Sequence, residues 1–283
     1  MNILVIGPGR IGSAFAFHLS RAGHDVAVLA RGARLEILRR EGAVVATDGR
    51  RASIRVLETI DPSTAYDLVL VTVLAHQVDA LLPALVASAA KSVLFMFNTF
   101  ETTRRWREAV GAERFAFGFP NMIAFLEDDK LRNVVDGPGM LTTLTSPRWA
   151  EVFKRAGLPT EVTGDIDGWL RSHVAFVVPL MVAAQWTWQR QPPLSWAEAR
   201  RLALAMREGM ALVRSLGHAI QPGFVALLAR LPAPVLAGLL WAVGRTAAVK
   251  DMGAFGSAEV RSLIDAMAAA DPLRTSTLRS IRP

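Results

Sequence analysis

The feature that most constrains this chain is a glycine motif near its first residue. An apolar run, Ile3 to Ile6, leads directly into Gly7-x-Gly9-x-x-Gly12, and a helical pattern follows over residues 13–22. A strand, a glycine-rich turn and a helix in this order are typical of a site that holds the pyrophosphate of a dinucleotide. We therefore predict a dinucleotide site in this segment.

Each glycine of the motif has its own physical role. Gly7 permits the tight turn off the strand, Gly9 lets a diphosphate approach the backbone, and Gly12 lets the helix pack closely on the strand. The helix start, with Arg10 and Ile11, presents free N–H groups and the positive end of the helix dipole to the phosphates. The alternative is a coincidental glycine-rich turn, and the strand before the motif and the helix after it favour the cofactor site.

The second predicted strand indicates which dinucleotide is bound. It covers residues 26–30, and an NAD site usually carries Asp or Glu at its end to bind the ribose 2′-hydroxyl. Here that position holds Arg31. An acid would repel a 2′-phosphate, whereas Arg can bind it through two hydrogen bonds. The sequence therefore predicts NADPH (NADP+), with Arg31 as the main 2′-phosphate contact. Arg34 is either a second contact or a solvated charge on the next helix.

Composition excludes several classes of protein. The 283 residues suffice for one large or two medium domains, and a hydrophobic content of 52% excludes a disordered chain. Without cysteine there is no disulfide, thiolate nucleophile or cysteine metal site, and the five His lack metal-ligand spacing, so we predict no metal. The apolar start lacks the basic flank of a secretory signal, and the longest apolar stretch, residues 174–184, is too short to cross a bilayer. We expect a cytoplasmic protein without a membrane partner.

The net charge of +7 is unevenly distributed. Residues 1–165 hold 19 basic and 18 acidic residues, whereas residues 166–283 hold 13 and 7. A nucleic-acid partner usually requires a clustered basic patch with aromatic residues for stacking. In this chain the Arg residues are scattered among apolar helices, so we expect no nucleic-acid partner. The basic excess is attributed to an anionic cofactor or substrate, or to an Arg-rich composition.

Strands and helices alternate along the first part of the chain. Beyond the first two strands, further strands are expected at residues 44–46, 54–56, 67–73, 92–97, 115–119, 140–145 and 160–162, with helices at 34–40, 78–90, 101–110 and 147–156. Such alternation predicts an α/β Rossmann domain over residues 1–165, with a doubly wound and mainly parallel sheet.

The pattern becomes helical after residue 165. Helices are expected at residues 168–190, 195–216, 223–231, 234–243 and 258–269, and the tail, residues 274–283, is expected to fray. Residues 166–283 are therefore predicted to form an all-α domain for substrate binding or dimerisation, with the active site in the cleft between the domains. The apolar helices favour a homodimer, although a tight monomeric core would give the same pattern.

Over nearly its whole length the chain resembles the ketopantoate reductase (2-dehydropantoate 2-reductase) family. The resemblance rests on the glycine motif, Arg31, Thr47-Asp48-Gly49, Val71-Thr72-Val73 with Gln77, Asn98 after a buried strand, Pro179-Leu180, and Asp251 with Glu259. It implies the family fold and reduction of a 2-keto acid with NADPH. It also implies that Gln77 and Asn98 contact the cofactor, Asn98 next to the nicotinamide ribose. The alternative for Asn98 is a turn or helix-cap residue.

The residues that the family uses for catalysis are largely replaced. The family places a Lys and two Asn at intervals of four before Pro-Leu, where this chain has Leu170, Val174 and Val178. A shift of one residue instead places Arg171 at the Lys position. The substrate-binding Ser of the family corresponds to Ala247 in this chain.

Three residues remain as catalytic candidates. Arg171 can stabilise charge on a carbonyl oxygen, but a guanidinium holds its protons too tightly to be a good proton donor. His173 has the neutral-range pKa of a proton donor, and its alternative is a partly buried His that is satisfied by its surroundings. Glu259 would bind a substrate hydroxyl or pair with an Arg.

Two functions therefore stay open. The first is an NADPH-dependent reductase that transfers hydride to a carbonyl of a 2-keto acid, or of a more apolar ketone or imine with an anionic group held by Arg171. Ketopantoate itself remains among these substrates, and the apolar Leu170, Val174 and Val178 favour the more hydrophobic ones. The second is a non-catalytic NADPH-binding protein of the same fold, which the missing Lys and Asn residues favour.

Overall fold

The computed structural model describes residues 1–283 except 138–139, 191–192, 247–248, 250–252 and 254–256. The chain divides into two compact units. The first comprises Met1–Asn98 and Thr103–Ile166, and the second comprises Thr99–Thr102 and Asp167–Pro283. The short segment 99–102 thus belongs with the helical part of the chain, although it lies within the α/β part of the sequence.

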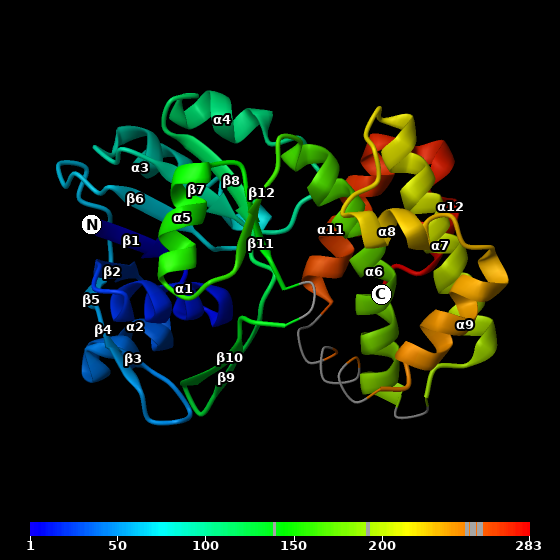
Figure 1. The fold of residues 1–283 in the computed structure, drawn as a ribbon, viewed down its shortest axis with the longest axis horizontal. Helices are drawn as coiled ribbons and strands as arrows, with labels where there is room; N and C mark the ends of the chain where they lie inside the picture. Colours follow the sequence, from blue (N-terminus) through cyan, green and yellow to red (C-terminus); the bar gives the residue numbers. More distant parts are fainter. Residues whose placement is uncertain (138–139, 191–192, 247–248, 250–252, 254–256) are drawn as a thin grey trace. The chain divides into compact units, whose positions relative to one another are not determined.

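The first unit is built on an eight-stranded sheet with the order β12-β11-β8-β7-β6-β1-β2-β5 (Figure 1). Its strands are β1 (Asn2–Ile6), β2 (Asp25–Leu29), β5 (Arg55–Leu57), β6 (Leu68–Val71), β7 (Val93–Met96), β8 (Phe115–Phe119), β11 (Thr142–Leu144) and β12 (Thr160–Val162). Every neighbouring pair is parallel except β8 and β11. The predicted doubly wound, mainly parallel sheet is confirmed.

Helices cover both faces of this sheet. They are α1 (Arg10–Arg21), α2 (Gly32–Glu41), α3 (Leu82–Ala87), α4 (Arg104–Val110) and α5 (Pro147–Arg155). Successive strand residues point to opposite faces. Leu94 and Met96 of β7 accordingly join one core cluster with the apolar residues of α1, α2 and α5. Phe95 between them faces the other side, where it packs with Trp106 of α4 and Phe117.

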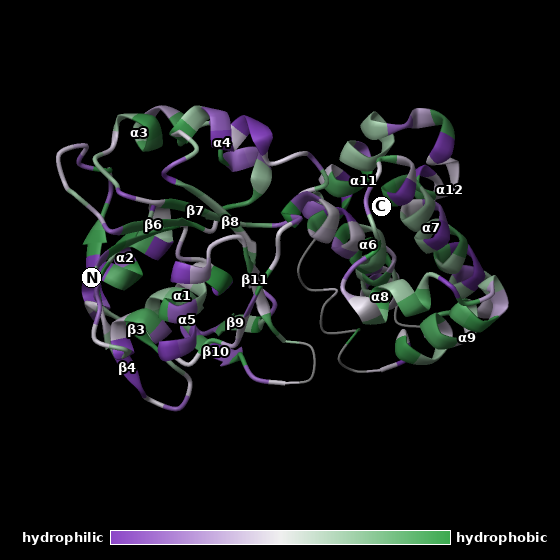
Figure 2. Cartoon of the chain, turned by 45° about the horizontal axis from the view of Figure 1, so that its top comes forward, coloured by the Kyte–Doolittle hydropathy of each residue, from purple (hydrophilic) through white to green (hydrophobic). Residues whose placement is uncertain are grey.

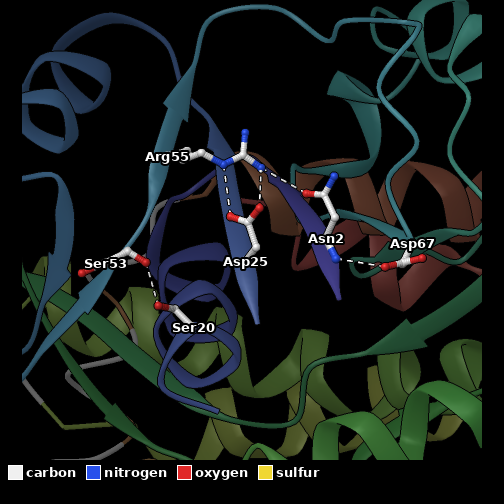
Figure 3. A network of polar contacts seen from close by, with 6 residues as sticks. All are labelled: Asn2, Ser20, Asp25, Ser53, Arg55 and Asp67. Atoms are coloured by element: carbon white, nitrogen blue, oxygen red, sulfur yellow. Dashed lines mark hydrogen bonds and ion pairs between the residues drawn. The ribbon is translucent and has the colours of Figure 1, made fainter. Parts of the chain in front are cut away.

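Two hairpins lie outside the main sheet. β3 (Ala43–Val45) pairs with β4 (Arg51–Ser53), and β9 (Ile123–Glu127) pairs with β10 (Lys130–Val134). The first is fixed to α1, where Ser20 Oγ donates to Ser53 O at 2.6 Å (Figure 3). The second was not predicted from the sequence. Its two-residue turn places Asp128 and Asp129 at φ of 46° and 65°, which such turns require and which Asp tolerates.

Polar contacts join the amino ends of the central parallel strands (Figure 3). Arg55 donates to both carboxylate oxygens of Asp25, at 3.1 and 3.2 Å, and to Asn2 Oδ1 at 3.1 Å. The backbone N–H of Asn2 donates to Asp67 at 2.9 Å, and Lys91 donates to the same carboxylate at 2.8 Å. Lys91, followed by the Asn2 N–H, holds the pKa of Asp67 below its usual value. This network fixes the strand ends at the edge opposite the glycine motif.

The second unit is helical. It contains α6 (Ile166–Arg190), α7 (Trp196–Ser215), α8 (Gly223–Leu228), α9 (Ala233–Val243), α11 (Ala258–Ala270) and α12 (Ser276–Ser280). α7 starts with a capping box, in which Glu198 accepts from the Ser195 N–H at 2.9 Å and Ser195 Oγ accepts from the Glu198 N–H. Figure 2 shows α9 as mostly hydrophobic. The predicted all-helical C-terminal region is confirmed.

The tail does not fray, so that expectation was wrong. Glu208 of α7 accepts from the backbone N–H groups of Thr277 and Leu278, at 3.0 and 2.9 Å. Leu278 and Ile281 are 0% and 1% exposed and belong to the core of the helical unit. A carboxylate at the start of α12 and two buried apolar side chains together outweigh the entropy of the chain end.

One helix in the described part of the chain is long and apolar enough to cross a membrane by length and composition. It is Ile166–Gln189 of α6, and 61% of its apolar window is buried in the structure. A buried core helix passes the same test, so this finding is weak evidence for a membrane span.

Candidate cofactor-binding site

The carboxyl ends of four parallel strands meet at one edge of the sheet. β1 lies between β2 and β6 in the sheet. After β1 the chain adds β2 on one side of it, and later adds β6 and β7 on the other side. Open α/β sheets bind ligands at such a switch point. The structure brings the predicted cofactor residues to this edge, since the glycine motif follows β1, Arg31 follows β2, Gln77 follows β6 and Asn98 follows β7.

The glycine turn has the geometry that the motif predicts. Gly7 has φ of +85°, and a Cβ there would lie 2.6 Å from Val73 Cγ1. A Cβ on Gly12 would overlap the carbonyl oxygen of Gly7 and lie 2.5 Å from Thr72 Oγ1. At Gly9, by contrast, no atom lies within 4 Å of the Cβ position. The turn is therefore closely packed on the strand side and open at Gly9, where a diphosphate would approach.

The first turn of α1 presents backbone N–H groups at the same place. Gly9 is the N-cap and supplies no side-chain cap, and the first turn contains no acid. The first intrahelical bond runs from the Ser13 N–H to Gly9 O at 2.9 Å. The N–H groups of Arg10, Ile11 and Gly12 precede it and have no acceptor within the helix. These groups and the helix dipole suit phosphate oxygens.

Thr72 holds the glycine turn, a role that the sequence did not reveal. Its hydroxyl lies 2.9 Å from both Ile6 O and Gly7 O, so the residue after β6 is tied to the last residue of β1 and the first of the turn. A hydroxyl has one proton and shares it between the two carbonyls. The signal in the sequence was a polar residue between Val71 and Val73 in an otherwise apolar strand.

The two arginines after β2 have different environments. Arg31 is exposed, and its guanidinium has no hydrogen bond or ion pair among the described residues. It is the N-cap of α2, which starts at Gly32 with φ of +55°. Arg34 is half-buried, and its guanidinium is bonded to Pro8 O and Ser13 Oγ. The alternative in which Arg34 is a solvated charge was therefore wrong.

Asn98 has a buried side-chain oxygen without a partner. Its Oδ1 has no hydrogen bond within the part of the chain that the structure describes. Such an acceptor costs about 1–3 kcal/mol when it is left unsatisfied. The N-cap of the following helix, α4, is Thr103, so the helix-cap alternative for Asn98 was wrong. An orphaned acceptor at this edge of the sheet fits a hydroxyl or amide group of a bound dinucleotide.

Gln77 is exposed and serves a local purpose. Its Oε1 accepts from the Leu74 N–H at 3.1 Å, and the Gln77 N–H donates to Leu74 O at 2.8 Å. This closes the short 3₁₀ turn Ala75–Gln77 that follows β6. Its contact with a cofactor stays a prediction.

Arg171 lies near the start of α6 and is held within the helical unit. Its Nε donates to Phe100 O at 3.1 Å, its Nη1 lies 2.7 Å from His218 Nε2, and its guanidinium lies 5.7 Å from the centre of the Phe100 ring. Arginine has five N–H donors, and among the described residues Nη2 makes no hydrogen bond. Nη2 therefore remains available to an anionic group.

His173 stacks on an aromatic neighbour one turn away. Its ring is parallel to that of Trp169, with an interplanar angle of 8° and centroids 5.2 Å apart. Burial lowers the pKa of His173 to about 3. The ring is therefore neutral at pH 7 and is poorly suited to release a proton there.

The remaining predicted residues of the helical unit have different environments. Leu170, Val174 and Val178 are each 0% exposed, and the two valines belong to the core of that unit. Glu259 lies in the first turn of α11. Ala247 and Asp251 lie outside the described residues. The described residues contain no group of three or more His, Asp or Glu side chains that would hold a metal ion.

Comparison with known proteins identifies the N-terminal part of the chain. Residues 3–142 match the family model of the ketopantoate reductase PanE/ApbA. The chain thus carries a domain of the ketopantoate reductase family. A 2-dehydropantoate 2-reductase of Vibrio cholerae is 35% identical over 97 residues, which cover 34% of this chain and only 31% of that relative. The family is one of oxidoreductases.

The solved structures that resemble the whole chain include the following two. The 2-dehydropantoate 2-reductase from Geobacter metallireducens has a TM-score of 0.74 at 17% identity, covering 100% of this chain and 98% of that one. D-mandelate dehydrogenase in complex with NADH and anilino(oxo)acetate has a TM-score of 0.73 at 12% identity, with the same coverage. At these identities the likeness shows the fold alone.

Proposed function

We propose that this protein is an NADPH-dependent oxidoreductase that reduces the carbonyl of a 2-keto acid, or of a more apolar ketone or imine. The observation that carries the proposal is the buried Asn98 Oδ1 without a partner, at the same sheet edge as the open Gly9. A chain with no ligand at this edge would gain stability by satisfying that oxygen. The unsatisfied oxygen of Asn98 therefore supports a bound group that supplies the missing donor.

The cofactor preference rests on Arg31. The residue is exposed at the end of β2, where NAD sites usually carry an acid. A guanidinium without an ion-pair partner in the described chain suits a 2′-phosphate, which binds Arg in a bidentate way. Gly7, Gly9 and Gly12, with the N–H groups of the first turn of α1, would hold the pyrophosphate.

The chemistry of the reaction divides between cofactor and protein. NADPH, when bound, supplies a hydride to the carbonyl carbon. The Nη2 group of Arg171 would bind the negative charge of the substrate carboxylate or of its carbonyl oxygen. Glu259 or water would deliver the proton. His173 is the least suitable donor, because burial keeps it neutral at pH 7.

The substrate class follows from the same residues. Arg171 favours a carbonyl compound with an anionic group, while Leu170, Val174 and Val178 are each 0% exposed and offer a substrate no polar side chain at the family's Lys and Asn positions. The ligand named for D-mandelate dehydrogenase, anilino(oxo)acetate, combines an oxo acid with an aryl group on the same fold. We therefore expect aryl- or alkyl-substituted 2-keto acids to be better substrates than ketopantoate.

Direct titration tests the cofactor part of the proposal. The fluorescence of the reduced nicotinamide reports binding of NADPH and NADH without any substrate. We expect NADPH to bind at least tenfold more tightly. Equal affinities, or tighter NADH binding, would overturn the assignment of NADPH. Oxidation of NADPH in the presence of ketopantoate, phenylglyoxylate and a cyclic imine then tests the reaction.

A non-catalytic NADPH-binding protein is the second candidate. It is favoured by the burial of Leu170, Val174 and Val178, which leaves no polar group at the positions where the family has its Lys and Asn. Tight NADPH binding without oxidation across the same substrate panel would support it. Turnover of any of these substrates at about 1 s⁻¹ or faster would exclude it.

A further inference from the structure

The guanidinium of Arg34 is bonded to the glycine turn itself. Its Nε donates to Pro8 O at 3.0 Å, and its Nη2 donates to Ser13 Oγ at 2.9 Å. The Ser13 hydroxyl in turn donates to Pro8 O at 2.9 Å and is fully buried. The carbonyl between Gly7 and Gly9 therefore accepts two hydrogen bonds, and the orientation of the Pro8–Gly9 peptide is fixed from α2.

The third contact of Arg34 reaches the hairpin that the sequence did not predict. Its Nη1 donates to Asp129 O at 3.2 Å, in the turn between β9 and β10. The hairpin is itself fixed, because Leu131 O accepts from the Thr47 N–H at 2.9 Å and Asn133 Nδ2 lies 2.8 Å from His18 Nε2 of α1. Arg34 thus connects a fixed hairpin to the turn that precedes α1.

These contacts commit three of the five N–H donors of Arg34 to the protein itself. All three guanidinium nitrogens donate to the protein, and the head group is half-buried. Burial, opposed in part by Asp129, lowers the pKa of Arg34 from its usual value. A desolvated cation of this kind needs its hydrogen bonds to be kept when a ligand arrives. Arg31, three residues earlier in the sequence, makes no such hydrogen bonds among the described residues.

We propose that Arg34 is a positioning residue, which braces the glycine turn against the β9–β10 hairpin so that the turn is preformed for a dinucleotide pyrophosphate, while Arg31 alone reads the 2′-phosphate. The proposal rests on the proposed function, since it concerns the same cofactor site. It separates the two arginines by what they act on. Arg31 acts on the part that distinguishes NADPH from NADH, and Arg34 acts on the part that the two cofactors share.

Binding of two cofactors to three variants tests this separation. Arg34→Met is expected to weaken the binding of NADPH and of NADH by the same factor. That factor is roughly tenfold, because charge-assisted hydrogen bonds are lost. Arg31→Met is expected to weaken NADPH by about tenfold and to leave NADH unchanged. Arg40→Met removes the same charge from an exposed position of α2 and is expected to change neither.

Hydrogen exchange of the free protein tests the brace without any cofactor. Backbone amides in the peptide covering residues 7–13 are expected to exchange faster in Arg34→Met than in the wild type, and to be unchanged in Arg40→Met. Ser13→Ala removes only the hydroxyl between Arg34 and Pro8 O. It is expected to weaken cofactor binding and to speed amide exchange in residues 7–13, each by less than Arg34→Met does. It serves as the second variant if Arg34→Met does not fold.

Three results would overturn the inference. They are a loss of NADPH affinity alone in Arg34→Met, unchanged exchange of residues 7–13, or full recovery by Arg34→Lys, which keeps the charge but not the forked geometry. Wild-type protein that binds neither cofactor would instead overturn the proposed function. The exchange measurement would still decide whether Arg34 braces the turn.

Discussion

Replacing Asn98 by Leu should make the fold more stable and the binding of the cofactor weaker. The side-chain oxygen of Asn98 is buried and has no hydrogen-bond partner in the described chain. Leucine has nearly the same shape and no polar atom, so the substitution removes an unsatisfied acceptor without opening a cavity. The same substitution removes the acceptor that we assign to the bound dinucleotide.

The size of both effects follows from the desolvation of one acceptor. Leaving it unsatisfied costs about 1–3 kcal/mol. Taking the lower end of this range, we expect a net gain of about 1 kcal/mol, or a rise of about 2–4 °C in the midpoint of thermal unfolding for a domain of this size. A ligand hydroxyl left without its acceptor costs about 1–2 kcal/mol, so the Kd for NADPH should rise about tenfold.

Differential scanning calorimetry and cofactor titration measure the two effects on the same sample. Asn133→Leu is the matched control for stability, because Asn133 has a partner, His18 Nε2 at 2.8 Å, and its replacement should lower the unfolding midpoint. If Asn98→Leu lowered the midpoint as well and left NADPH binding unchanged, the amide would be a structural residue. The assignment of Asn98 to the cofactor would then be refuted.

Three further predictions concern the helical unit. Arg171→Ala should lower turnover at least tenfold with similar NADPH affinity, because we assign Arg171 to the substrate and not to the cofactor. Unchanged turnover in steady-state kinetics would remove that role. His173 has a pKa of about 3 in the folded protein and about 6.5 when unfolded, so the unfolded chain binds more protons between these values. Stability should therefore fall by about 1–2 kcal/mol between pH 7 and pH 5, and urea unfolding of His173→Gln should show a smaller fall. Glu208→Gln should cost about 1–2 kcal/mol and speed amide exchange in residues 275–281, because an amide nitrogen cannot accept from the Thr277 or Leu278 N–H.

The architecture could be predicted because its signals are local. Buried parallel strands produce continuous apolar runs, such as residues 68–71 and 93–96, and each helix in the first unit follows a strand. The glycine motif placed the cofactor turn, since only glycine adopts φ of +85° at Gly7 without strain. These features depend on neighbours in the sequence, and a single chain displays them.

The missed elements depend on tertiary context. The β9–β10 hairpin has Asp128-Asp129 at its turn instead of the usual Asn-Gly or Asp-Gly, so the strongest turn signal was absent. The helix expected at residues 78–90 is shorter, Leu82–Ala87, because Pro83 fits only its first turn. The tail packs because Glu208, about 70 residues away in sequence, accepts its N–H groups.

The site was only partly predictable for the same reason. Sequence patterns identify Gly7, Gly9, Gly12, Arg31 and Asn98 by their positions after strands. The hydroxyl of Thr72 and the guanidinium of Arg34 act on carbonyl oxygens of the turn, and those contacts join residues that are 26 or more positions apart. Periodicity and spacing carry no information on such contacts.

The two arginines after β2 show how environment decides the role of a residue type. Arg31 and Arg34 have the same charge, follow the same strand and are three residues apart, so the sequence supports a 2′-phosphate contact for either. Burial and bonding separate them, because three of the five N–H donors of Arg34 already bond to Pro8, Ser13 and Asp129, and moving the guanidinium toward a phosphate would break those bonds. An exposed guanidinium pays no such cost. The unpredicted hairpin therefore changes the interpretation of the cofactor site, because its Asp129 carbonyl is the acceptor that completes the fixation of Arg34.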